Sequence, residues 1–213
     1  MNSSPVEVVL FDLGNVILPF NNFQIAEKLA RFSQANEFRD PQKIFSYIFD
    51  FQEGAINPFD AGKLSPEDFF QSLRKTLRLP ISFEQFIPIW TDIFTENQEV
   101  SRIILSLKGR KRLGLLSNTD SLHFNYILST FPIVKIFEKY ILSYEVGFTK
   151  PDVRIFQEAL KWASVEPRQV LFIDDTKGHV EAAASLGMQD IRFISADQLR
   201  KELSMKLNFI NKG

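Results

Sequence analysis

Short apolar segments alternate with helical segments from residue 113 onward, and this alternation is the strongest constraint on the fold. The expected strands cover residues 6–11, 113–116, 140–142, 170–173 and 191–194. The expected helices cover residues 121–130, 151–163, 178–186 and 196–206. Strands separated by helices pair in parallel, and the helices then cover both faces of the sheet. The sequence therefore predicts a Rossmann-like α/β fold whose functional crevice lies beyond the carboxyl ends of the strands.

Residues 20–95 follow a different pattern, with apolar side chains at helical spacing. The repeats include Phe69, Phe70, Leu73 and Leu77, and the same spacing explains most of the 22 phenylalanines as helix-packing residues. We expect a helical cap domain at 20–95, inserted into an α/β core domain formed by 1–19 and 96–213. Residues 51–64 interrupt the helical pattern and are a candidate substrate-facing loop.

Composition excludes several other classes of protein. With 213 residues, 45% of them hydrophobic and 24% charged, the chain can bury one sizeable core, so neither a disordered nor a collagen-like protein is expected. A net charge of −1 gives no basic field for nucleic acid. No apolar run approaches the ~18 residues of a membrane span, and the N-terminus has no basic leader segment. We expect a cytoplasmic protein with neither a nucleic-acid nor a membrane partner.

Two aspartate signals follow expected strands at opposite ends of the chain. Asp12 comes directly after residues 6–11, and Asp174-Asp175 comes after 170–173. Carboxylates that converge at one edge of a sheet repel each other unless a cation neutralises them. The chain has no cysteine and only two histidines, so oxygen ligands remain for such a cation. The pattern predicts a Mg²⁺ site, although an acidic helix N-terminus is an alternative explanation for Asp174-Asp175.

Four motifs in chain order make the sequence resemble the haloacid dehalogenase-like hydrolase superfamily. They are Asp12-Leu13-Gly14-Asn15-Val16, Leu116-Ser117-Asn118-Thr119, Lys150-Pro151 at the opening of a helix, and Asp174-Asp175. Each motif is weak alone, whereas the ordered set is specific and spans nearly the whole chain. The inserted helices resemble the C1 caps of this superfamily. The residues of the first two motifs are similar to those of the subgroup that contains sugar-1-phosphate phosphatases.

The resemblance implies a role for each motif. Asp12 would attack phosphorus and form an aspartyl-phosphate. Ser117 and the backbone amide of Asn118 would bind the phosphate, and the Lys150 ammonium would offset the negative charge that opposes attack. Mg²⁺ would be held by Asp12, the Gly14 carbonyl and the acidic pair. Asp175 is favoured as the direct ligand, with Asp174 acting through water, but this assignment stays open.

The chain departs from the superfamily pattern at Gly14, where phosphatases usually carry a second aspartate that transfers protons. General acid–base help worth about 10²–10⁴ in rate must then come from elsewhere or be forgone. Substrates with good leaving groups, such as anomeric sugar phosphates, would suffer least. His123 and His179 are possible replacements, but each is better explained as an ordinary packed or surface histidine. The candidate substrate contacts near the cap loops are Phe20, Glu53, Asn57, Asp60 and Lys63.

Three functions are consistent with these motifs, and the leading one is a Mg²⁺-dependent phosphatase that acts on a small phosphomonoester. The second is a haloacid dehalogenase, in which Asp12 displaces halide from carbon without a metal, leaving Asp174-Asp175 unexplained. The third is a non-catalytic module that binds a phosphorylated ligand, which the loss of an acid at Gly14 keeps open. A dinucleotide-binding enzyme is excluded, because no Gly-x-Gly-x-x-Gly follows the first expected strand.

Overall fold

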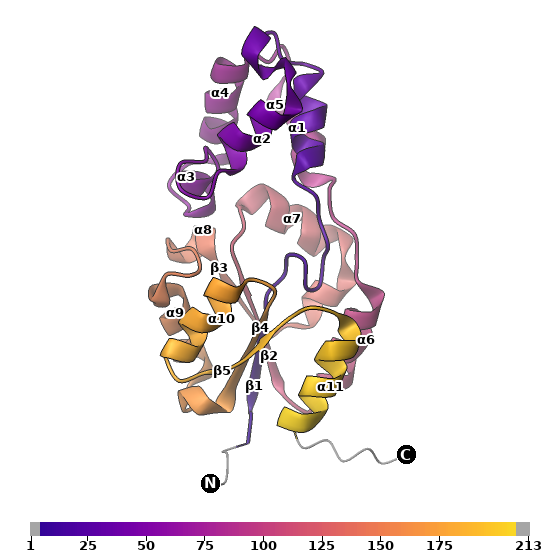
Figure 1. Ribbon diagram of the computed structural model, residues 1–213, viewed down its shortest axis with the longest axis vertical. Helices are drawn as coiled ribbons and strands as arrows, with labels where there is room; N and C mark the ends of the chain where they lie inside the picture. The colour runs from indigo at the N-terminus through magenta and orange to yellow at the C-terminus, as the bar shows by residue number, and fades with distance from the viewer. Residues whose placement is uncertain (1–4, 208–213) are drawn as a thin grey trace.

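A parallel sheet lies at the centre of the protein, as seen in a computed structural model that describes residues 5–207 (Figure 1). Its strands are β1 (Val8–Phe11), β2 (Arg112–Ser117), β3 (Lys139–Leu142), β4 (Val170–Asp174) and β5 (Gln189–Arg192). They are arranged in the order β3-β2-β1-β4-β5, and each neighbouring pair is parallel. The predicted α/β fold is confirmed, with strand bounds that differ from the expected ones by two residues or fewer.

Helices cover both faces of the sheet. One face packs against α9 (Val153–Ala163) and α10 (Lys177–Ser185), and the other against α6 (Gln98–Leu107), α7 (Ser121–Thr130) and α11 (Ala196–Lys206). Alternate residues of β1 pack against the helices on opposite faces of the sheet. Val8 and Leu10 belong to one core cluster, whereas Val9 and Phe11 belong to the other. All four are fully buried, and burial of such a side chain contributes about 1.5–3 kcal/mol. The central strand therefore has no polar face.

The segment between β1 and β2 forms a second helical layer above the carboxyl ends of the strands (Figure 1). It contains α1 (Phe23–Ala30), α2 (Pro41–Phe49), α3 (Asn57–Asp60), α4 (Pro66–Leu77) and α5 (Phe83–Thr91). These helices share a hydrophobic core of their own, in which Phe69 packs against both Phe86 and Trp90. Ser65 begins α4 as predicted, because its hydroxyl accepts a hydrogen bond from the Asp68 amide.

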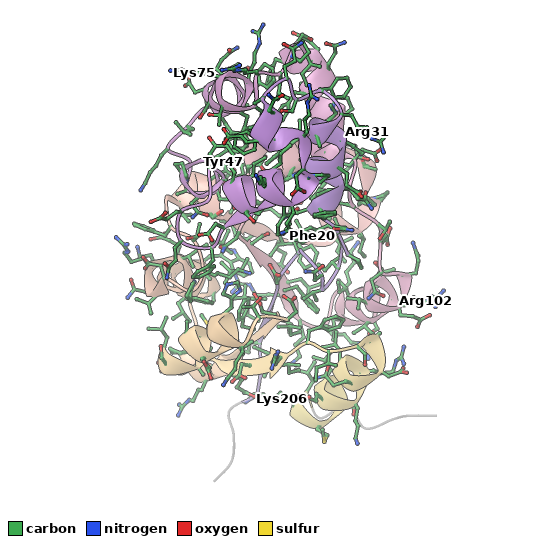
Figure 2. All side chains as sticks on the ribbon, turned by 45° about the horizontal axis from the view of Figure 1, so that its top comes forward. Phe20, Arg31, Tyr47, Lys75, Arg102 and Lys206 are labelled. Carbon is green, nitrogen blue, oxygen red and sulfur yellow. The ribbon has the colours of Figure 1, made fainter. Side chains whose placement is uncertain are left out.

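The two chain segments that join this helical layer to the sheet run side by side. Phe20 and Phe94 form an antiparallel bridge, and the Thr95 amide donates to the Pro19 carbonyl at 2.9 Å. Figure 2 shows Phe20 where the upper helices meet the sheet. Domain boundaries at residues 20 and 95 stay a prediction.

Two short helical stretches depart from the expected pattern. Residues 57–60, expected within a loop, form the single turn of α3, and α8 (Ser143–Val146) adds another turn directly after β3. Three 3₁₀ turns within residues 5–207 lie at Asn36–Arg39, Pro132–Ile136 and Pro167–Gln169. Within residues 5–207, no helix has the length and apolar character needed to cross a membrane.

The strand order places a crevice at the carboxyl end of β1. The chain passes from β1 through β2 to β3 on one side, then crosses to β4 on the other. A parallel sheet leaves a ligand-sized gap where its strand order reverses in this way. The residues that follow β1, β2 and β4 therefore share one crevice, and the helical layer of residues 23–91 lies above it (Figure 1).

Candidate active site

Asp12 is the first residue after β1 and lies buried at the floor of the crevice. Its amide donates to the Ile173 carbonyl at 2.8 Å, which extends the pairing of β1 with β4 by one residue. The chain then turns sharply, and the Val16 amide donates back to the Gly14 carbonyl at 2.7 Å. The predicted turn is present, but its positive φ of 55° belongs to Asn15.

Gly14 is required for a different reason, which is the approach of Phe20. A Cβ atom at residue 14 would lie 2.6 Å from Cε1 of the Phe20 ring. The ring itself packs against Phe94, with centroids 5.6 Å apart. A side chain at residue 14, including the aspartate usual in phosphatases, would therefore displace Phe20.

Lys150 brings the motifs of β1, β2 and β4 together. Its Nζ atom donates to Asp12 Oδ1 at 2.7 Å, to Asp174 Oδ2 at 2.6 Å and to the Leu116 carbonyl at 3.0 Å. These three acceptors use all the protons of an ammonium group. The side chain is buried, which disfavours its charge, but the two carboxylates outweigh burial and raise the Lys150 pKa. Lys150 is therefore a fixed positive charge on the floor of the crevice.

Asn118 positions Lys150 by holding its backbone. The Asn118 side chain accepts from the Lys150 amide at 2.7 Å and donates to the Lys150 carbonyl at 3.0 Å. The following peptide bond, Lys150–Pro151, is cis. Helix α9 begins at Val153 rather than at Pro151 as predicted, because Asp152 acts as its cap and accepts from the Arg154 amide.

Three carboxylates converge beside Lys150. Oxygen atoms of Asp12, Asp174 and Asp175 lie within 4.8 Å of one another. Burial raises the pKa of Asp12 to about 7 despite Lys150. Burial also acts on Asp174, but Lys150 and His179 outweigh it and lower the Asp174 pKa to about 2. One lysine cannot balance three carboxylates, and this all-oxygen donor set suits Mg²⁺.

The two members of the acidic pair have different surroundings. Asp174 is fully buried and accepts from Lys150, from the Thr176 amide at 2.8 Å, and lies 3.0 Å from Nδ1 of His179. Asp175 is half-buried, and its carboxylate accepts from the Thr176 hydroxyl at 3.3 Å. Asp174 is thus already engaged by Lys150 and His179, whereas Asp175 keeps oxygen atoms available. His179 is a partner of Asp174 and also lines the cavity.

A cavity of about 560 Å³ lies between the sheet and the helical layer. Gly14, Ser117, Asn118 and Lys150 contribute to its floor, and Ser117 comes from the end of β2. Of the cap residues expected to meet a substrate, Phe20, Asn57 and Asp60 line this cavity. Glu53 and Lys63, expected to do the same, are exposed and lie outside the lining.

His123 belongs to a buried polar cluster at the upper side of the cavity. Its Nδ1 atom lies 2.7 Å from Asp120 Oδ2, and its Nε2 atom lies 2.8 Å from the Trp90 carbonyl. The Trp90 indole also donates to Asp120 at 3.0 Å. Asp120 was not among the predicted site residues. The spacing Asp120-x-x-His123 at the start of a helix is the signal that could have identified it, because the Asp120 carboxylate caps α7 through the His123 amide.

The match to a known family decides the classification. A family model described as haloacid dehalogenase-like hydrolase matches residues 6–187. The chain belongs to this family. Among curated relatives of this haloacid dehalogenase-like hydrolase, a D-ribitol-5-phosphate phosphatase of Bacteroides thetaiotaomicron is 25% identical over 95% of this chain and 99% of its own length.

Solved structures of the family share this fold. A family enzyme of Bacteroides thetaiotaomicron in complex with magnesium and inorganic phosphate has a TM-score of 0.76 and 24% identity, covering 87% of this chain and 93% of its own. An L-2-haloacid dehalogenase of Xanthobacter autotrophicus has a TM-score of 0.62 and 16% identity, covering 94% and 83% of the two chains. Because both a magnesium-binding enzyme and a dehalogenase have the fold, the fold alone does not specify the reaction.

Proposed function

We propose that this haloacid dehalogenase-like hydrolase is a Mg²⁺-dependent phosphatase that hydrolyses a small phosphomonoester through an aspartyl-phosphate on Asp12. The observation that carries the proposal is the convergence of Asp12, Lys150 and the acidic pair beside the cavity that Lys150 lines. A dehalogenase needs a carboxylate nucleophile but no metal, which leaves two further carboxylates beside the nucleophile unexplained. A phosphatase needs them, because a cation must neutralise both the nucleophile and the phosphate.

The chain's own groups account for most of the chemistry. A carboxylate oxygen of Asp12 forms a bond to phosphorus while the bond from phosphorus to the ester oxygen breaks, and water then hydrolyses the aspartyl-phosphate. Lys150 holds the attacking group through its 2.7 Å hydrogen bond and offsets its charge. The Ser117 hydroxyl and the Asn118 backbone amide are the proposed donors to the phosphate oxygens, since both residues line the cavity at the carboxyl end of β2.

The proposed Mg²⁺ ligands are Asp12, the Gly14 carbonyl and Asp175. Asp175 is preferred to Asp174, because Lys150 and His179 already occupy the Asp174 carboxylate. We assign Asp174 to an indirect role, in which it orients Lys150. When bound, Mg²⁺ would supply positive charge that neutralises the phosphate and the carboxylates.

Gly14 restricts the substrates that such a site can process quickly. No acid at residue 14 protonates the leaving oxygen, which must then take its proton from water or leave as an anion. Good leaving groups are least affected. The names of two relatives, a D-ribitol-5-phosphate phosphatase and a phosphorylated carbohydrates phosphatase of Thermotoga maritima, support a phosphorylated sugar or sugar alcohol as the substrate class. A cytoplasmic location stays a prediction.

Phosphate release from a panel of sugar and sugar-alcohol phosphates, with an aryl phosphate included, tests the proposal. We expect release that requires Mg²⁺, stops with EDTA and is lost in Asp12→Asn. Asp197→Asn is the matched control, because Asp197 is an exposed aspartate on α11, and this variant should retain wild-type activity. Activity that survives in Asp12→Asn would remove Asp12 as the nucleophile. Halide release from a 2-haloacid, without phosphate release, would favour the dehalogenase instead.

A further inference from the structure

The cavity has a second polar end, centred on Asp60, that the proposed chemistry leaves unused. Asp60 is the last residue of α3 and lines the cavity together with Asn57, Thr119 and His123. Within residues 5–207, no protein group donates a hydrogen bond to its carboxyl group. The side chain is half-buried and faces the cavity, so its carboxyl group is reachable from there. An unpartnered carboxyl in a cavity wall is therefore available to a ligand.

The Asp60 segment is held tightly against the sheet domain. Two residues later, Gly62 has a φ of +66°, and a Cβ atom there would lie 2.0 Å from the Tyr144 carbonyl oxygen. Only glycine permits both the backbone conformation and this close approach. Asp60 is thus presented to the cavity from a fixed segment of the helical layer.

The charged groups that face Asp60 are Asp120 and His123, both from α7 or its cap. Asp120 and His123 already form hydrogen bonds with each other and with Trp90. Both His123 ring nitrogens face acceptors, Asp120 Oδ2 and the Trp90 carbonyl, so both carry protons and the ring is an imidazolium. Asp120 accepts from the His123 ring, the His123 amide and the Trp90 indole. This pair fixes the wall beside Asp60 and leaves the Asp60 carboxyl to the cavity.

Asp60 lines the cavity, whereas Asp12 lies beside it and contacts Lys150 of its floor, and the two carboxyl groups have different electrostatic surroundings. The charges that act on Asp12 belong to Lys150, Asp174 and Asp175, whereas those that act on Asp60 belong to Asp120 and His123. A phosphomonoester whose phosphate lies against Asp12 and Lys150 would direct its organic part toward the other end. Asp60 would then meet the leaving group and not the phosphate.

We propose that Asp60 determines specificity by hydrogen bonding to hydroxyl groups on the leaving group, which selects polyhydroxylated phosphomonoesters. This inference rests on the proposed phosphatase function. Its support is the unpartnered carboxyl and the aromatic side chains of the same cavity, Phe20, Phe49 and Phe94, which suit the C–H faces of a polyol. A leaving group without hydroxyl groups would leave the Asp60 carboxyl group unpaired, and the cavity binds it less tightly.

The test compares kcat/KM for a sugar-alcohol phosphate with kcat/KM for an aryl phosphate, in the presence of Mg²⁺. In Asp60→Ala we expect the ratio of the two values to fall by about tenfold to 100-fold, through KM for the sugar-alcohol phosphate, because the hydrogen bonds between the carboxyl group and the hydroxyl groups are lost. Asp60→Asn keeps the size of the side chain and can still hydrogen bond to hydroxyl groups. Its ratio should therefore lie closer to that of the wild type than the ratio of Asp60→Ala does.

Glu53→Gln is the matched control, since Glu53 is an exposed acid in the same part of the helical layer but outside the cavity lining. Its ratio should equal that of the wild type. An unchanged ratio in Asp60→Ala, or an equal loss on both esters, would overturn the specificity role of Asp60. Wild-type protein that releases phosphate from neither ester would overturn the proposed function, and this inference with it.

Discussion

The side chain of Asn118 binds the backbone of Lys150 from both sides, accepting from its amide at 2.7 Å and donating to its carbonyl at 3.0 Å. The two residues are far apart in sequence and belong to different motifs of the family. Through this contact, the loop after β2 sets the direction from which the Lys150 side chain reaches Asp12. Asn118 thus positions the positive charge of the Lys150 side chain.

Replacing Asn118 with alanine should reduce kcat for an aryl phosphate by about 10²-fold, because a displacement of a catalytic group by one ångström has effects of that size. The loss of two hydrogen bonds should also lower the free energy of unfolding by about 1–3 kcal/mol. Steady-state kinetics and urea unfolding measure the two effects. Asn118→Asp keeps the acceptor and should show a smaller loss than alanine. Full activity in Asn118→Ala would show that Lys150 needs no such support.

Lys150→Met should be the most destabilising single change at the floor of the cavity. It leaves Asp12 and Asp174 buried without their cation, and breaking a buried ion pair from one side costs about 3–5 kcal/mol. Urea unfolding at pH 7 measures this loss, and added Mg²⁺ should restore part of it by supplying positive charge. Lys161→Met is the control, because Lys161 forms an exposed pair with Glu158 worth about 0–1 kcal/mol. Equal stability of the two variants would contradict the charge balance described for this site.

The sequence predicted the sheet and its functional edge because both are encoded locally. Runs of β-forming residues such as 170–173 mark strands, and the residue that follows each run must lie at the carboxyl edge of a parallel sheet. The order of motifs also predicted that Asp12, Lys150 and the acidic pair lie in one place. The structure places Lys150 Nζ 2.7 Å from Asp12 Oδ1, whereas the catalytic roles of the two residues stay a prediction.

Contacts between segments that are distant in sequence were not predictable in this way. The bond from Asn118 to Lys150 depends on how two loops meet, and the contact of Phe20 with Gly14 depends on the path by which the chain enters α1. Asp120 was missed because its partner Trp90 lies on α5, so only the packing of α5 on α7 brings the two together. Periodicity carries no information about such pairs.

The buried Asp120–His123 pair should show strong thermodynamic coupling. Asp120→Asn and His123→Gln each leave one member without its partner, so we expect the double variant to be less destabilised than the sum, with a coupling energy of about 1–3 kcal/mol. Urea unfolding of the four proteins gives this value. Additive effects would mean that the two side chains, although 2.7 Å apart, contribute independently.

The coupling should be measured between pH 5 and 6, where both Asp120 and His123 contribute to stability. Burial opposes both charges, but mutual attraction lowers the pKa of Asp120 and raises that of His123. Stability from Asp120 is present above its unfolded pKa of 3.8 and is lost on acidification. Stability from His123 is fully present below its unfolded pKa of 6.5 and is lost as pH rises through its folded value. Both contributions are therefore large in that window.

Gly14→Ala should destabilise the protein by about 1–3 kcal/mol, because the added methyl group overlaps the Phe20 ring. Replacing the Phe20 ring with the smaller side chain of leucine should relieve the overlap. The double variant Gly14→Ala/Phe20→Leu should therefore melt at a higher temperature than Gly14→Ala. The same reasoning applies to Gly14→Asp, which would introduce an acid near the leaving group but should fold well only with Phe20→Leu. Thermal denaturation of Gly14→Ala, of Phe20→Leu and of the double variant Gly14→Ala/Phe20→Leu separates relief of overlap from loss of packing. A double variant that is less stable than Gly14→Ala would show that the ring is not the obstacle.

Asp60→Asn should stabilise the protein increasingly as pH rises from 4 to 8. Burial, together with Asp120 and against the smaller effect of His123, raises the pKa of Asp60 to about 8 from 3.8. A carboxyl group whose pKa is higher in the folded state binds more protons there, so its contribution to stability is fully present below 3.8 and declines until pH passes 8. The amide of asparagine has no proton to lose, and the difference in melting temperature between variant and wild type should therefore grow across this range and then level off. Thermal denaturation at several pH values, with Glu53→Gln in parallel, measures this difference. A difference that does not change with pH would show that Asp60 is ionised throughout and that water already satisfies its carboxylate in the cavity.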